Sequence, residues 1–196
     1  NVLAGNELVI GLVLGNWLLL TGLGSLLGRY AGRLQNPVRW LIVSQVAIAI
    51  LPLLHISAIR LLKKLFVPGL LLGLNETFLF SLLVLLPYCI ISGFLLTLFA
   101  GLGGTRKDEQ QIGNIYVVDV IGDIIGGLLF SFCLIFFFTP FQVLTFLLVL
   151  NLSAAILVVY TEQNRRAAAA VMLVMAVSLL AIAVFDLEKI TGQAMF

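Results

Sequence analysis

The stretch YVVDVIGDIIGGLLFSFCLIFFF (residues 116–138) places two aspartates in a segment that is otherwise apolar enough to cross a membrane. A helix needs about 20 mostly apolar residues to span a bilayer. A carboxylate near mid-membrane costs at least about 2.5–3.5 kcal/mol, so each one needs a partner, water or a proton. The stretch therefore predicts a membrane helix with a special acidic face.

That face carries Tyr116, Asp119, Gly122, Asp123 and Gly126, whose spacing puts all five on one side of a helix. Gly122 and Gly126 form a GxxxG pair, which allows a second helix to approach closely. We expect the carboxylates, which share the face, to point into a bundle and to bind a proton, a small cation or an amine. The alternative is that Asp119 hydrogen-bonds a neighbouring helix near the membrane interface; Asp123 lies deeper and is the stronger candidate ligand.

The whole chain has the composition of a membrane protein. Of its 196 residues, 62% are hydrophobic and 10% are charged, which no soluble globular domain of this length matches. The hydrophobic pattern predicts an all-α, polytopic transmembrane bundle that forms a single domain over residues 1–196. Its six predicted spans cover residues 8–27, 38–59, 77–102, 112–138, 141–160 and 167–185.

Two further segments carry local predictions. Residues 60–74 are too short and too broken by Pro68 and Gly69 to span, so we expect an interfacial helix followed by a turn. In the first span, a stripe of small residues predicts close helix packing; it consists of Gly11, Gly15, Gly22 and Ser25.

Basic residues are unequally divided between the two sides of the predicted bundle. The linkers after spans one, three and five hold seven, whereas the other side holds four. The positive-inside rule then places the first set in the cytoplasm and both ends of this chain on the outer face. The seven are Arg29, Arg33, Arg39, Arg106, Lys107, Arg165 and Arg166; the four are Arg60, Lys63, Lys64 and Lys189.

No catalytic constellation stands out in the sequence. Cys89 and Cys133 lie inside apolar runs, and His55 is a lone histidine near the end of a span. Without His, Cys, Asp or Glu at ligand spacing we expect no metal and no cofactor in this chain. The scattered basic residues form no patch for nucleic acid, so the expected environment is the lipid bilayer.

Several segments together resemble the membrane domain of bacterial fused spermidine synthase-like proteins. The resembling stretches are WLLLTGLGSLLGRYAGR (17–33), LVLLPYCIISGFLLTLFA (83–100), IGNIYVVDVIGDIIGGLLFSF (112–132) and the junction FDLEKITGQAMF (185–196). The third is the most specific: Gly113, Tyr116, Asp119, Gly122, Gly126 and Gly127 match the family's pattern, and Asp123 stands where a small residue is usual.

The resemblance implies a fragment of a longer chain, with one span before residue 1 and an aminopropyltransferase-like domain after residue 196. It also implies the bacterial cytoplasmic membrane and a polyamine or other small cation as ligand. The family's catalytic residues belong to the soluble domain, so none is carried over. The two predictions conflict at the C-terminus. A synthase domain that uses a cytoplasmic donor should face the cytoplasm, whereas the count of basic residues places the end of this chain outside.

The rival hypothesis is a non-enzymatic transport or complex-assembly subunit. In that case the acids would carry protons or hold a partner helix, and partner subunits or a homo-oligomer would be expected.

Overall fold

The computed structural model describes residues 7–63, 73–103, 109–162 and 165–185, and within these residues the chain is helical, with no strand. Three short helical segments, η1 (Arg29–Arg33), η2 (Phe130–Leu134) and α5 (Ile135–Phe137), accompany the long helices. The long helices are α1 (Glu7–Gly28), α2 (Pro37–Lys63), α3 (Leu74–Gly103), α4 (Glu109–Leu129), α6 (Pro140–Thr161) and α7 (Arg165–Phe185).

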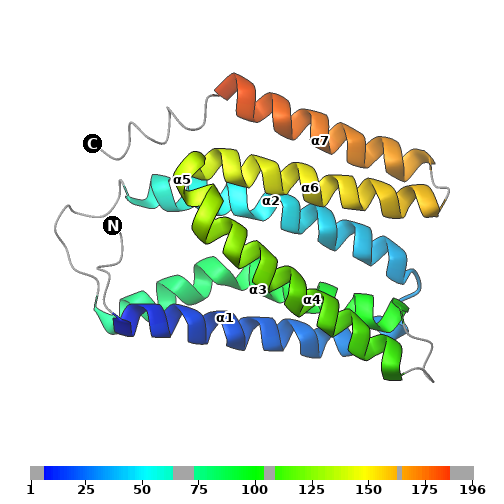
Figure 1. The fold of residues 1–196 in the computed structure, drawn as a ribbon, viewed down its shortest axis with the longest axis horizontal. Coiled ribbons are helices and arrows are strands. Elements are labelled where there is room, and N and C mark those ends of the chain that lie inside the picture. Colours follow the sequence, from blue (N-terminus) through cyan, green and yellow to red (C-terminus); the bar gives the residue numbers. More distant parts are fainter. Residues whose placement is uncertain (1–6, 64–72, 104–108, 163–164, 186–196) are drawn as a thin grey trace.

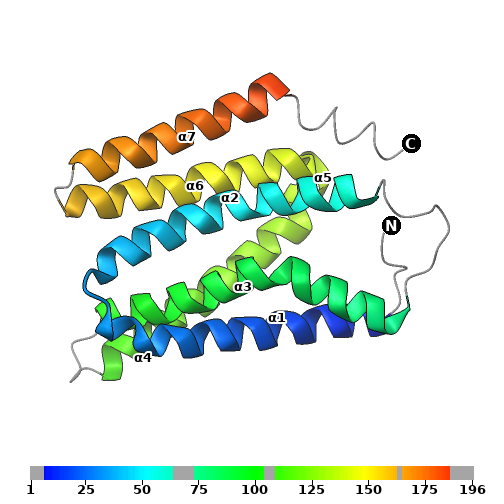
Figure 2. The same ribbon diagram turned by 180° about the vertical axis from the view of Figure 1, so that it is seen from behind.

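The long helices lie side by side and alternate in direction along the chain, as in a polytopic bundle (Figure 1). α1 packs most extensively on α3, α2 joins α3 to α6, and α7 packs on α6. α4 crosses α3 obliquely on one face of this layer, in front of α3 in Figure 1 and behind it in Figure 2. α3 changes direction near its middle, where Pro87 removes a helical hydrogen bond.

Five of the described helical stretches are long and apolar enough to cross a membrane. They match the first five predicted spans and have the bounds Glu7–Ala31, Pro37–Ile59, Leu74–Leu102, Gly113–Phe137 and Pro140–Thr161. The sixth predicted span corresponds to α7, whose described apolar part, Ala167–Ile182, is shorter than a spanning helix requires. The prediction of an all-helical chain with several membrane-length helices is confirmed.

The predicted interfacial helix at residues 60–74 is replaced in part by α2. This helix continues without a break to Lys63, so Arg60 and Lys63 belong to its last turn. Residues 64–72 lie outside the described part of the chain, and α3 begins at Leu74.

A short hairpin joins the fourth and fifth spans. Phe138 adopts an extended backbone that ends α5. Thr139 caps α6 in a capping box with Gln142, and Pro140 occupies the first turn, where its missing N–H costs nothing.

Between α4 and α5 the π-helical turn η2 interrupts the regular hydrogen-bond pattern without ending the helix.

Glycines do bring two helices into backbone contact, at α1 and α3. A Cβ on Gly24 would collide with the carbonyl group of Ile90, and a Cβ on Gly93 would collide with the carbonyl group of Thr21. A Cβ on Gly28 would overlap the side chain of Thr97. These glycines therefore set how closely α1 and α3 approach each other.

The glycines that the sequence predicts as packing sites do not make this contact. A Cβ on Gly11, Gly15, Gly22, Gly122 or Gly126 would meet no atom within 4 Å. On α1 the glycines that contact α3 are Gly24 and Gly28 instead. Ser25 of the predicted stripe does take part in the contact with α3: its hydroxyl donates to the carbonyl of Gly93 at 3.3 Å. The prediction of close packing at these five glycines is wrong for contacts within the described chain.

Polar side chains also connect α1 to α3 and α2 to α6. Asn16 of α1 is 2% exposed, and its amide donates to Ser81 Oγ at 2.8 Å and to the carbonyl of Phe78 at 3.0 Å, both on α3. Gln45 of α2 donates to Asn151 Oδ1 of α6 at 2.7 Å. In an apolar medium such bonds hold neighbouring helices in register.

Removing the bond between Gln45 and Asn151 should measurably loosen α2 from α6. We expect Gln45→Leu and Asn151→Leu to be coupled by about 0.6–1.7 kcal/mol in a double-mutant cycle, the range found for interhelical hydrogen bonds in membranes. The measurement is the free energy of unfolding in mixed micelles titrated with a denaturing detergent. Additive effects of the two substitutions would show that the bond contributes nothing.

The apolar core is centred on α6. Leu148, Leu152, Ala155 and Val159 have no exposed surface and pack with residues of α2 and α7. Because α6 lies between α2 and α7, these three helices form one packed group, and α1 with α3 forms the other. A second buried cluster, which includes Leu41 of α2 with Leu95 and Leu98 of α3, joins the two groups.

Candidate functional site: the acidic face of α4

α4 carries the candidate ligands on a helix that the rest of the described chain hardly covers. From residue 113 to residue 132 Ile115 alone is half-buried, and every other residue is exposed. Tyr116, Asp119 and Asp123 are all among the exposed residues. The prediction that both carboxylates point into the bundle is therefore wrong for the described residues.

The physical reason is the way α4 crosses α3. The two helices cross obliquely (Figure 1), so their contact is short and residues 116–132 stay exposed. Gly122 and Gly126 therefore have open space beside them.

One of the two aspartates nevertheless contributes to a groove. Where α4 meets α3 and the start of α2, a groove of about 450 Å³ is lined by six apolar residues and by Asp119. Asp123, one turn further along, does not line it. The six apolar residues are Leu41, Leu96, Phe99, Leu102, Ile115 and Val118.

Depth along the span favours Asp123 as a ligand, whereas Asp119 is the aspartate that lines a groove. A single carboxylate at the edge of an apolar groove attracts a cation, and a cation with an aliphatic chain also buries that chain. The face of Phe99 is a further place where an ammonium group is attracted.

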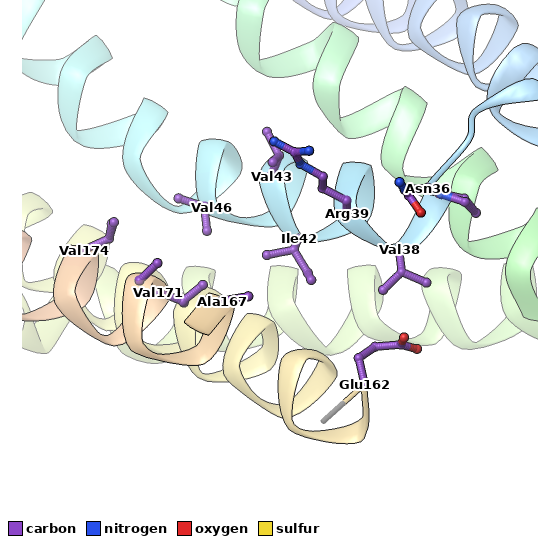
Figure 3. Close-up of a pocket in the computed structure, with 12 residues that line it drawn as sticks. Asn36, Val38, Arg39, Ile42, Val43, Val46, Glu162, Ala167, Val171 and Val174 are labelled. Carbon is purple, nitrogen blue, oxygen red and sulfur yellow. The ribbon is translucent and has the colours of Figure 1, made fainter. Parts of the chain in front are cut away.

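A second groove lies at the same end of the bundle, between α2 and α7 (Figure 3). Its volume is about 710 Å³. Apolar side chains of the two helices form most of its lining, and Asn36, Arg39 and Glu162 supply its polar groups. Sequence reasoning missed this groove because its walls come from the second span and from α7, which are far apart in the chain.

The remaining candidate groups are scattered. His55 is half-buried in α2, Cys89 is buried in α3, and Cys133 is half-buried in η2. Within the described residues no three His, Cys, Asp or Glu side chains gather closely enough to hold a metal ion together.

The fold, the apolar surface and the five membrane-length helices define an α-helical membrane protein. No family model, curated protein or solved structure matches the chain.

Proposed function

We propose that the chain is the membrane domain of a spermidine synthase-like protein and that it binds a small aliphatic amine at the acidic face of α4. The observation that supports this most directly is the groove in which Asp119 is the one charged residue among apolar neighbours. The amine's ammonium group would pair with the Asp119 carboxylate, and its methylene chain would lie against Leu96 and Phe99.

Polyamines have the right chemistry for such a groove, because they combine ammonium groups with short apolar chains. Asp123 lies one helical turn from Asp119, about 6 Å along the axis, on the open side of α4. A second ammonium group can reach it from the mouth of the groove. In this proposal Asp119 anchors the amine and Asp123 holds its outer end.

The proposal also includes an anchoring role. The membrane domain would hold an aminopropyltransferase-like domain at the bacterial cytoplasmic membrane, close to the amine that this domain uses. The family resemblance supports this part, and the geometry of the described residues neither requires nor opposes it.

A second function is supported by a different observation. Gly122 and Gly126 face open space on a helix with two exposed carboxylates, and a bare acidic face in lipid is costly. In an assembly subunit this face would be covered by a helix of another subunit or of a second copy, and the carboxylates would serve that contact.

Asp119→Asn should weaken amine binding strongly while preserving the shape of the side chain. A hydrogen bond to a charged group contributes about 1.5–3 kcal/mol, which corresponds to a loss of roughly 10- to 150-fold in affinity. The measurement is equilibrium binding of radiolabelled spermidine to the full-length protein in lipid nanodiscs.

Asp123→Asn makes the same change one turn away and outside the groove, so it tests the outer contact separately. We expect a smaller loss than in Asp119→Asn, because Asp123 holds only the outer end of the amine. Equal losses of affinity in both variants would show that the groove does not contribute to amine binding. Unchanged binding in both, together with a loss of oligomers on Gly126→Leu, would favour the assembly subunit instead.

A further inference from the structure

The groove between α2 and α7 has apolar walls and opposite charges at one end. Along α2, Ile42 and Val46 line it; along α7, Ala167, Val171 and Val174 do (Figure 3). α6 packs against both helices, and Glu162, which follows its last residue, lines the groove. From Val38 to Val46 the lining extends about 12 Å along the α2 axis, since each helical residue rises about 1.5 Å.

The polar groups lie where a membrane places its headgroups. α2 enters its spanning stretch at Pro37 and α6 leaves its own at Thr161, so Arg39 and Glu162 are both within two residues of a span end. Figure 3 shows Glu162 extending toward Val38 and Arg39 lying beside Val43. Both side chains are exposed, and no ion pair joins them in the described structure.

The helix ends reinforce these two charges. α2 begins at Pro37, so its positive N-terminal end lies beside Arg39, and both favour an anion. α6 ends at Thr161, so its negative C-terminal end lies beside Glu162, and both favour a cation. The mouth of the groove therefore has a site for a negative group and a site for a positive group.

We propose that this groove binds one phospholipid with a zwitterionic amine headgroup, of the phosphatidylethanolamine class. Arg39 and the start of α2 bind the phosphate, Glu162 and the end of α6 bind the primary ammonium, and an acyl chain lies along Ile42, Val46 and Val171. A lipid whose headgroup is only anionic would satisfy Arg39 and be repelled by Glu162. A choline headgroup carries the positive charge but has no N–H to donate to the carboxylate.

The test is native mass spectrometry of the full-length chain, purified in detergent and supplied with equal amounts of one phospholipid at a time. We expect one phosphatidylethanolamine to be retained per chain at concentrations where phosphatidylglycerol and phosphatidylcholine are not. Arg39→Gln and Glu162→Gln should each reduce retention about tenfold. Arg33→Gln is the matched control, because it removes an exposed arginine at the same end of the bundle and outside the groove.

A second pair of variants tests the apolar part without removing a charge. Ala170 lines the groove and is exposed, whereas its neighbour Ala169 is exposed outside it. Ala170→Phe should fill the groove and abolish retention, and Ala169→Phe should leave it unchanged. Thermal unfolding of every variant verifies that the bundle still forms.

Three results would overturn the proposal. Stronger retention of phosphatidylglycerol would show that the site selects negative charge alone. Identical retention by the Arg39, Glu162 and Arg33 variants would show that the charges at the mouth do not bind the headgroup. A lipid-free dimer that Ala170→Phe converts to a monomer would show that a second copy of the chain occupies the groove.

Discussion

Gly93→Leu should prevent α1 and α3 from forming their native contact. Gly93 lies against the backbone of Thr21 and Ser25, and backbone atoms cannot rotate away as a side chain can. Ordinary overpacking of a core costs about 1–3 kcal/mol, and we expect this substitution to cost about 3 kcal/mol or more. The apparent melting temperature should fall by about 6–12 °C.

The thiol of Cys89 makes this measurable. Cys89 is fully buried, so in a Cys133→Ser background a thiol-reactive fluorophore reacts only as the bundle unfolds. Gly22→Leu is the control, since Gly22 lies on α1 in open space and replacing a helical glycine adds up to about 0.8 kcal/mol of stability. If both leucine variants melt at the same temperature, the glycine contact does not hold α1 against α3.

Asn16→Ala should give the next largest loss, about 2 kcal/mol or about 4–8 °C in melting temperature. The substitution removes two hydrogen bonds from Asn16 to α3 and leaves a cavity in a position that is 2% exposed. Asn16→Asp should be worse, because it keeps the shape but places a carboxylate oxygen against the carbonyl of Phe78.

The same fluorophore assay measures both variants. Asn114→Ala is the matched control, because Asn114 is exposed on α4. A protein that tolerates Asn16→Asp as well as Asn114→Ala would show that the buried amide does not bind α1 to α3.

Hydropathy predicted the helices well, because the length of an apolar run directly reflects the thickness of a bilayer. It could not predict which face of each helix meets another, since in a membrane protein the lipid-facing and protein-facing sides are equally apolar. Small residues were the available signal, but the stripe chosen on α1 did not include Gly24 and Gly28, which make the contact. The buried polar residue Asn16 was a better indicator of that interface, because a polar side chain inside an apolar helix needs a partner.

The surroundings of the candidate site could not be predicted from the sequence either. The spacing of Asp119 and Asp123 correctly placed both on one helix, but their surroundings depend on the angle at which α4 crosses α3. That angle depends on the side chains of both helices where they meet, and no periodicity in α4 encodes it. The groove at Asp119 and the groove at Arg39 both arise from residues distant in the sequence.

The two groups of helices differ in how they can move. Backbone meets backbone at Gly24 and Gly93, so at these two points no side chain intervenes that could change rotamer and let α1 slide along α3. The contact between α2 and α3 is made by side chains and is less extensive. We expect any rearrangement of this bundle to move α1 and α3 together, with shear at the contact with α2. Since Leu41, Leu96 and Phe99 lie across that contact, such a movement would open or close the groove that holds Asp119.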